Sequence, residues 1–218
     1  MSGAPKAQNL PFPPVPPGPR AKVAQIDCPW HFETRAAVKV PGNDRSPQRH
    51  YPTADISHLK TIPMHEILDD DAWLFCWITG PLLVRGVHVI LARAWDLQLS
   101  GMGFTWIKLW NSFETSRLAT TPLLEQDLAV GGGYTTRKNA EFCVLMKRGN
   151  PSVARRDIRE VIISPRREHS RKPEEAYRRI EHFCAGPRID MFGGVQRSGW
   201  TYWGWQHWEE GTRQVSEG

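Results

Sequence analysis

The most apolar segment of the chain, AWLFCWIT at residues 72–79, shows no alternation of polar and apolar positions. A run of this kind indicates a strand that is buried on both faces, as in a parallel sheet covered by helices. A shorter run over 23–27 predicts a second buried strand, and Pro29 must end it because proline has no backbone N–H for the ladder. Further strands are predicted in the runs GFTWIKLWN, EFCVLMKR, VIIS, RIDMFGG and WTYWG.

Helical signals separate these strands. Helices are predicted over about 55–60, with Thr53 or Asp55 as the cap, over 63–68 and over 80–94. The segment PEEAYRRIEHFC has a proline at its start, acids in its first turn and apolar residues at helical spacing, which is typical of an amphipathic helix. Strands that alternate with helices predict an α/β fold with a mainly parallel sheet flanked by helices.

Composition divides the chain into three parts. Residues 1–20 contain seven prolines, which is typical of a flexible, polyproline-like leader. Residues 21–208 are predicted to form one domain, and residues 209–218 a flexible tail. The polar stretch after His31 predicts a long loop that reaches about His50.

Charge is unevenly distributed over the 218 residues. The chain has a net charge of +5, whereas residues 137–179 hold 13 Lys or Arg and 6 Asp or Glu, a net charge of +7. A basic segment on a nearly neutral body favours a polyanionic partner, although an ordinary solvated surface is the alternative interpretation.

Membrane, secretory and zinc-binding classes are disfavoured. The longest apolar region, 72–95, is interrupted by Gly80 and Pro81 and contains charged residues, and no signal peptide is visible. The four cysteines are far apart and form no C-x-x-C pair, so we expect no metal site. Unpaired cysteines in apolar runs favour a reduced, cytoplasmic location.

The turn at residues 27–30, DCPW, carries the most specific chemistry and resembles the D-P-P-W signature of amino-methyltransferases. The amino nitrogen of adenine becomes nucleophilic only when it pyramidalises, because its lone pair is otherwise delocalised into the ring. The Asp27 carboxylate and the backbone carbonyl of Cys28 or Pro29 can each accept one N–H and favour that geometry. Trp30 can stack on the purine. A strand-terminating turn with a buried tryptophan is the simpler alternative.

Other motifs occur in order with this turn, namely RHYPTADI, LFCWIT, WIKLW, AEFCVL, HSRKPEEAYRRIE, RIDMFGG and RSGWTYWGWQ. Together, over roughly residues 22–206, they resemble the adenine-N6 methyltransferase family typified by the catalytic subunit of the mRNA adenosine methyltransferase. The resemblance implies a Rossmann-like methyltransferase fold that uses S-adenosylmethionine. It also implies a permuted motif order, in which the catalytic turn precedes the cofactor strand.

The resemblance also implies roles for individual residues. Asp27, Cys28, Pro29 and Trp30 would hold the target base, and Tyr51 and Glu141 would lie on the substrate side. Lys172 would lie near the methionine end of the cofactor, where its ammonium can pair with a carboxylate. The cofactor-binding set implied by the family is Asp27, Lys172, Phe192, Gly193, Gly194, Val195, Gln196, Arg197 and Gln206.

Three positions depart from the family pattern. Cys28 stands where the family usually has proline, which keeps the backbone carbonyl but lowers the stiffness of the turn. Trp205 replaces a residue that is polar in some relatives, and Gly194 supplies no side chain. Four tryptophans lie near the end of the chain, namely Trp200, Trp203, Trp205 and Trp208. They could form a surface on which bases stack, but core packing is the favoured interpretation.

The expected function is therefore transfer of a methyl group from S-adenosylmethionine to adenine N6 in nucleic acid. Similarity to bacterial or phage members favours DNA over RNA, and a monomer or a homodimer is compatible with the sequence. One alternative is a catalytically weak or inactive nucleic-acid-binding partner subunit. Another is a protein glutamine methyltransferase, although such enzymes usually carry Asn and Tyr at the positions of Asp27 and Trp30.

Overall fold

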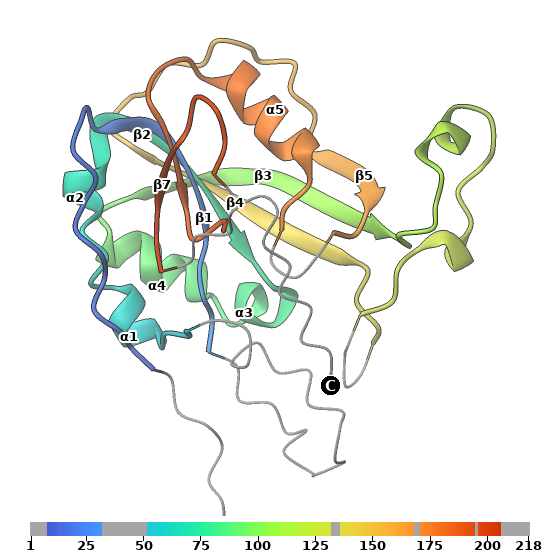
Figure 1. Ribbon diagram of the computed structural model, residues 1–218, viewed down its shortest axis with the longest axis horizontal. Helices are drawn as coiled ribbons and strands as arrows, with labels where there is room; N and C mark the ends of the chain where they lie inside the picture. Colours follow the sequence, from blue (N-terminus) through green and yellow to red (C-terminus); the bar gives the residue numbers. More distant parts are fainter. Residues whose placement is uncertain (1–7, 32–51, 132–135, 168–170, 195, 206–218) are drawn as a thin grey trace, which may run out of the picture.

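Seven strands form one sheet in the computed structural model, which describes residues 8–31, 52–131, 136–167, 171–194 and 196–205 (Figure 1). The strand order across the sheet is β5-β3-β4-β2-β1-β6-β7. The strands are β1 (Ala21–Asp27), β2 (Leu68–Ile78), β3 (Gln98–Leu109), β4 (Ala140–Arg148), β5 (Val161–Pro165), β6 (Arg188–Met191) and β7 (Thr201–Trp203).

One strand runs against all the others. β4 pairs antiparallel with both β2 and β3, whereas the pairs β1–β2, β1–β6, β3–β5 and β6–β7 are parallel. The described part of the connection from β3 to β4 holds no crossover helix against the sheet, which agrees with an antiparallel pair. The predicted α/β fold with a mainly parallel sheet is confirmed, with β4 as the reversed strand.

Helices cover both faces of the sheet (Figure 1). The prediction of a single helix over 80–94 is wrong in one respect, because the structure has two helices there. They are separated at Gly86, whose backbone is left-handed with a φ of +70°. Asp55 caps the first helix, since its carboxylate accepts the His58 N–H at 2.8 Å. The helices are α1 (Ile56–Leu59), α2 (Met64–Ile67), α3 (Gly80–Val84), α4 (Val87–Ala94) and α5 (Glu174–Phe183), with 3-10 turns η3 (Thr115–Ala119) and η4 (Glu125–Asp127).

Two apolar cores lie on opposite faces of the sheet. One core packs α1 to α4 against β1, β2 and β4, with Ile26, Leu74 and Leu91 fully buried. The other packs α5 against β2, β3 and β4, with Phe104 and Ile180 at its centre. Central strands buried on both faces explain why β2 has a continuous apolar sequence. The segment that carries η3 and η4 projects away from this body (Figure 1).

Residues 8–20 make ordered contacts, although residues 1–20 were expected to form a flexible leader. The Trp203 indole N–H donates to the Pro13 carbonyl at 3.1 Å, and the Trp205 indole N–H donates to the Pro11 carbonyl at 2.9 Å. Phe12 stacks on Trp205 and on His58, and these two rings also stack on each other. Proline carbonyls have no ladder partner and are strong acceptors, so the two indoles fix this segment beside β7. The domain boundaries at 21 and 208 stay a prediction.

No helix within the described ranges is both long enough and apolar enough to cross a membrane.

Candidate active site

The DCPW turn follows directly from the end of β1. Asp27 is the last residue of that strand, in register with Trp77 of β2. The Cys28 carbonyl accepts the Trp30 N–H at 2.8 Å, and the Pro29 carbonyl accepts the Ala54 N–H at 2.8 Å. These two bonds fix the turn against the segment that precedes α1. The Asp27 side chain is left 13% exposed at the carboxyl edge of the sheet.

Four charged side chains form a chain of contacts at this edge. The Lys172 ammonium lies 2.9 Å from Asp27 Oδ2 and 3.1 Å from Glu141 Oε2. The other carboxylate oxygen of Glu141 contacts the Lys108 ammonium. The four residues come from β1, β3, β4 and the segment before α5, so the sheet itself brings them together. Positive and negative charges alternate, and the group is neutral as a whole.

The two carboxyl groups respond differently to burial. Burial raises the pKa of Asp27, and the Lys172 ammonium opposes this effect without overcoming it. Burial also opposes ionisation of Glu141, but the ammonium groups of Lys172 and Lys108 outweigh it and lower the pKa of Glu141 to about 2. The difference arises because Glu141 contacts two cations and Asp27 contacts one. Burial opposes protonation of Lys172, yet the two carboxylates raise its pKa.

Indole rings flank the two ammonium groups. Lys172 Nζ lies 5.5 Å from the ring centroid of Trp77, and Lys108 Nζ lies 4.7 Å from that of Trp106. Aromatic faces attract cations, so each indole makes a favourable contact with the ammonium group beside it. The Trp77 indole N–H and the Thr79 hydroxyl are buried without a hydrogen-bond partner among the described residues. Such groups near the Asp27 edge leave polar capacity for a ligand.

A second turn lies beside the first one. Ile26 of β1 pairs with Met191 of β6, so Asp27 and Phe192 are the next residues on adjacent parallel strands. Phe192 has a left-handed backbone with φ of +61°, and Gly194 has φ of +76°. This register places the turns after β1 and β6 side by side at one edge of the sheet.

A buried acid supports the second turn from below. The Tyr177 hydroxyl donates to Asp190 Oδ2 at 2.8 Å, and Gln25 Nε2 lies 3.5 Å from Oδ1. Burial raises the pKa of Asp190 to about 7, and the two hydrogen bonds oppose this effect. A side chain at Gly193 would place its Cβ 2.2 Å from the same carboxylate, so only glycine fits above Asp190.

The structure brings together three of the predicted site residues by direct contact: Asp27, Glu141 and Lys172. Trp30 is only 5% exposed and belongs to the apolar core, so its ring presents no open face for stacking here. Gln196 is exposed, whereas Arg197 lies over the Tyr177 ring at 4.0 Å and pairs with Glu174. Three further candidates lie outside the described residues: Tyr51, Val195 and Gln206.

Sequence reasoning missed two residues of this site. Lys108 lies inside the strand WIKLW, and Asp190 lies inside the strand RIDM. A single charge within an otherwise apolar strand was the available signal, because such a charge needs a partner. The pattern could not show which partner each charge would find.

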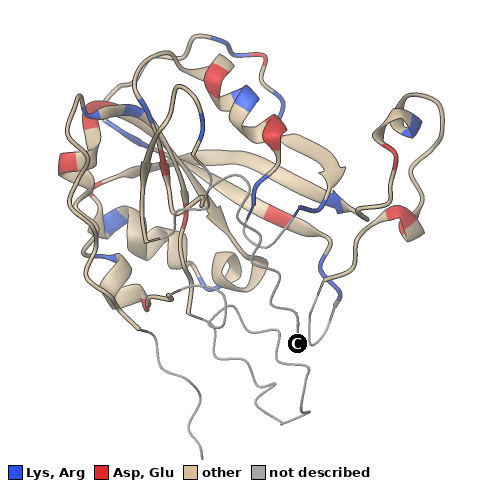
Figure 2. Ribbon diagram, viewed as in Figure 1, with Lys and Arg blue, Asp and Glu red and all other residues tan. Residues whose placement is uncertain are grey.

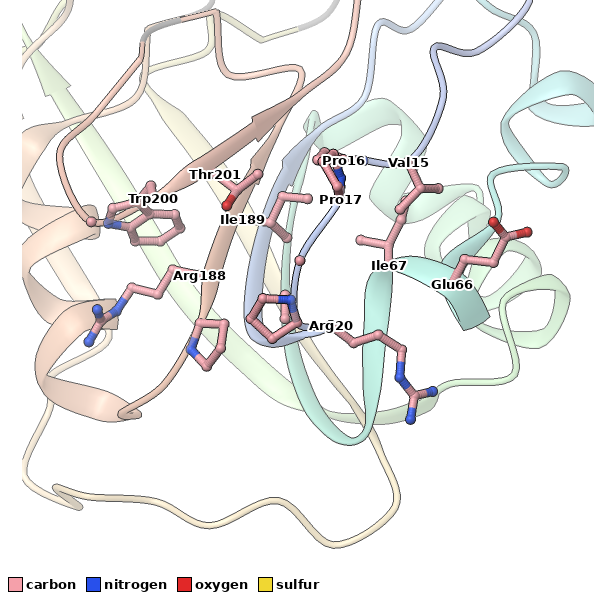
Figure 3. A pocket seen from close by; sticks show the side chains of 15 residues that line it. Val15, Pro16, Pro17, Arg20, Glu66, Ile67, Arg188, Ile189, Trp200 and Thr201 are labelled. Carbon is pink, nitrogen blue, oxygen red and sulfur yellow. The ribbon is translucent and has the colours of Figure 1, made fainter.

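A separate hollow lies at the far end of the same strands. Its volume is about 320 Å³, and it lies between the proline-rich segment, the start of β1 and the start of β6 (Figure 3). Arg20 and Arg188 line this hollow, whereas Asp27 lies at the opposite end of β1. The hollow is therefore distinct from the candidate active site.

The residues at the edge suit an amino-acid zwitterion next to a positively charged centre. The Asp27 carboxylate suits an ammonium or sulfonium charge, and the Lys172 ammonium suits a carboxylate. The unpartnered Trp77 and Thr79 groups suit a ligand that carries polar atoms. This donor set fits S-adenosylmethionine, which the sequence resemblance implies.

Comparison with known proteins gives consistent relatives. The chain is 30% identical over 130 residues to N(6)-adenosine-methyltransferase subunit METTL3 of Danio rerio, covering 58% of this chain and 20% of that protein. It is 28% identical over 157 residues to N(6)-adenosine-methyltransferase MT-A70-like of Arabidopsis thaliana, covering 69% and 20%. Human N(6)-adenosine-methyltransferase catalytic subunit METTL3 is 29% identical over 132 residues, covering 58% and 20%. The chain thus spans about a fifth of the length of these relatives.

A family model, MT-A70, matches residues 22–206. The matched range includes the turn after β1, the Glu141–Lys172 contact and the turn after β6, which the fold places at one edge of the sheet. Because the model matches most of the chain and the match includes this edge of the sheet, the chain belongs to the MT-A70 family.

Proposed function

We propose that the protein transfers a methyl group from S-adenosylmethionine to the N6 amino group of adenine in nucleic acid. The observation that carries the proposal is the contact between Asp27 and Lys172 at the end of β1, next to the turn after β6. Family membership and the names of the relatives support adenine N6 as the acceptor. The cofactor supplies a methyl group on a positively charged sulfur.

In this proposal Asp27 grips the acceptor amino group. Its carboxylate accepts one N–H, and the Pro29 or Cys28 carbonyl, each with a second lone pair, accepts the other. Two acceptors on one amino group favour the pyramidal nitrogen and stabilise its developing positive charge. The amino group loses one proton during the reaction, and Asp27 is a better proton acceptor than an ordinary aspartate because its pKa is raised.

Lys172 and Glu141 act in the proposal as the frame for Asp27. Lys172 holds the Asp27 carboxylate in one orientation, and Glu141 holds Lys172 from the opposite side. Trp30 packs into the apolar core, and the Ala54 N–H donates to the Pro29 carbonyl and keeps it in place. Such preorganisation contributes because the acceptors need no rearrangement as charge develops.

The nucleic acid proposed as the substrate is DNA. This choice rests on the sequence resemblance alone, whereas the relatives that match the chain are named for adenosine. A base in duplex DNA must also be flipped out of its stack before N6 can reach Asp27. We therefore propose DNA as the first substrate to test, with RNA as a parallel substrate.

The test supplies methyl-labelled cofactor with duplex DNA, single-stranded DNA, RNA or protein extract in separate reactions. We expect label on adenine N6 with the wild-type protein and a loss of about 100-fold or more with Asp27→Ala. Asp157→Ala is the matched control, because Asp157 is exposed and pairs with nearby Arg155. Label on protein glutamine, or equal activity in Asp27→Ala, would reject the proposal. Binding of nucleic acid without any label would favour the inactive partner subunit.

A further inference from the structure

Three arginines converge on one carboxylate at the start of α5. Arg167 Nη1 lies 2.6 Å from Glu174 Oε1, and Arg171 Nη2 lies 3.4 Å from the same atom. Arg197, from the segment after β6, contacts the other oxygen of Glu174. We call these four residues the arginine cluster. Three positive charges and one negative charge leave it with a net charge of +2.

This surplus distinguishes the arginine cluster from the charged chain at Asp27. The Asp27–Lys172–Glu141–Lys108 chain is neutral, although it lies at the edge of the same sheet. The three arginine side chains are only 24–28% exposed, so they are partly removed from water without full compensation. Partly desolvated cations attract an anion more strongly than solvated ones do.

The arginine cluster also has unused hydrogen-bond donors. A guanidinium carries five N–H groups, and Arg197 Nε is buried without a partner among the described residues. The Arg197 guanidinium carbon lies 4.0 Å from the centroid of the Tyr177 ring, which helps to hold the group in place. A fixed guanidinium fork matches the paired oxygens of a phosphate.

The position of the arginine cluster connects it to the candidate active site. Arg171 immediately precedes Lys172, and Arg197 follows the turn after β6, so the cluster adjoins both halves of the site. Figure 2 shows basic segments on the chain that leads to α5. A strand that places a base at Asp27 carries phosphates on both sides of that base. The arginine cluster adjoins this site in the chain and carries the positive charge that such a phosphate needs.

We propose that Arg167, Arg171 and Arg197 form a phosphate site for the nucleic-acid strand next to the target adenine. Glu174 holds the three guanidiniums together when no strand is bound and competes with the phosphate for them. This inference rests on the proposed function, since it assigns one backbone contact of the same substrate.

The experiment measures binding of a fluorescently labelled, adenine-containing oligonucleotide to the full chain at several salt concentrations. Arg167→Gln and Arg171→Gln should each weaken binding about fivefold or more and lower the slope of log K against log salt by about one. Glu174→Gln should tighten binding, because it removes the competing carboxylate. Arg155→Gln and Arg178→Gln are matched controls from local ion pairs, and both should bind like the wild type.

The two proposals fail in different ways. Equal losses in the control variants, an unchanged salt slope, or weaker binding by Glu174→Gln would overturn the phosphate site. A structural role for the cluster would lower the thermal stability of Arg167→Gln without changing the salt slope at temperatures where it is folded, which also overturns it. If the arginine variants lower the salt slope of binding but the wild-type protein methylates no adenine, the phosphate site is supported and the proposed function is rejected. No binding by the wild type overturns the phosphate site.

Discussion

Asp190 allows a quantitative prediction, because the structure buries this acid in the strand that leads to the turn after β6. Burial raises the pKa of Asp190 to about 7, against an ordinary value of 3.8. A gap of this size corresponds to about 4 kcal/mol between the folded and unfolded states. The groups that face the carboxylate are Tyr177, Gln25 and, at longer range, Asp27 and Arg197.

The sign of the effect follows from where the proton is held. Because the folded-state pKa is the higher one, the folded protein keeps the proton after the unfolded chain has lost it. The stability that this group contributes is therefore complete below pH 3.8 and is lost as pH rises to about 7. Asp190→Asn keeps an acceptor for the Tyr177 hydroxyl and removes the titration.

The assay is urea unfolding of the wild type and Asp190→Asn at several pH values. The difference in unfolding free energy between them should change by about 3 kcal/mol between about pH 5 and pH 8, in favour of the variant at the higher pH. Asp157→Asn, at an exposed site, is the control and should track the wild type. Parallel curves for the wild type and Asp190→Asn would show that the carboxylate is not buried as described.

Two further predictions concern Lys108 and Phe12. Lys108→Met leaves Glu141 with one cation, so the pKa of Glu141 should rise and Lys172 should shift away from Asp27. We expect the rate of methyl transfer to fall about tenfold, and the acidic side of its pH–rate profile to move to higher pH. Lys108→Arg should restore most of the rate, and an unchanged pH profile in Lys108→Met would contradict the assignment. Phe12→Ala removes the ring that stacks on both His58 and Trp205 and should cost about 1–2 kcal/mol in thermal unfolding, whereas an unchanged melting temperature would show that the segment is not docked.

The sequence predicted the elements that obey a local rule. Continuous apolar runs located the strands, and the proline after Asp27 located the end of β1. Core packing of Trp200 and Trp203, the favoured interpretation of the tryptophans, agrees with their burial at 7% and 2%. These predictions succeeded for one reason. A strand buried on both faces requires apolar residues throughout, and a strand end can be recognised from a proline, which has no N–H for the ladder.

The remainder depended on contacts between distant segments. No residue in β4 indicates that it runs antiparallel, because the apolar pattern of a strand does not depend on the direction in which the strand runs. The Lys108–Glu141 contact joins positions 33 residues apart, and the docking of the proline-rich segment depends on indoles at the other end of the chain. Gly86 was included in one long helix because a single glycine does not reveal a left-handed φ.

The adjacency of β1 and β6 has a consequence for how the protein is made. β1 ends at residue 27 and β6 begins at residue 188, yet they are hydrogen-bonded neighbours at the reactive edge. During synthesis the nascent chain must keep one side of β1 unpaired until β6 has left the ribosome. An unpaired, apolar strand edge promotes aggregation, and such late, long-range pairing is slow. Yield of active protein should therefore depend on slow expression at low temperature more than on the stability of the finished fold.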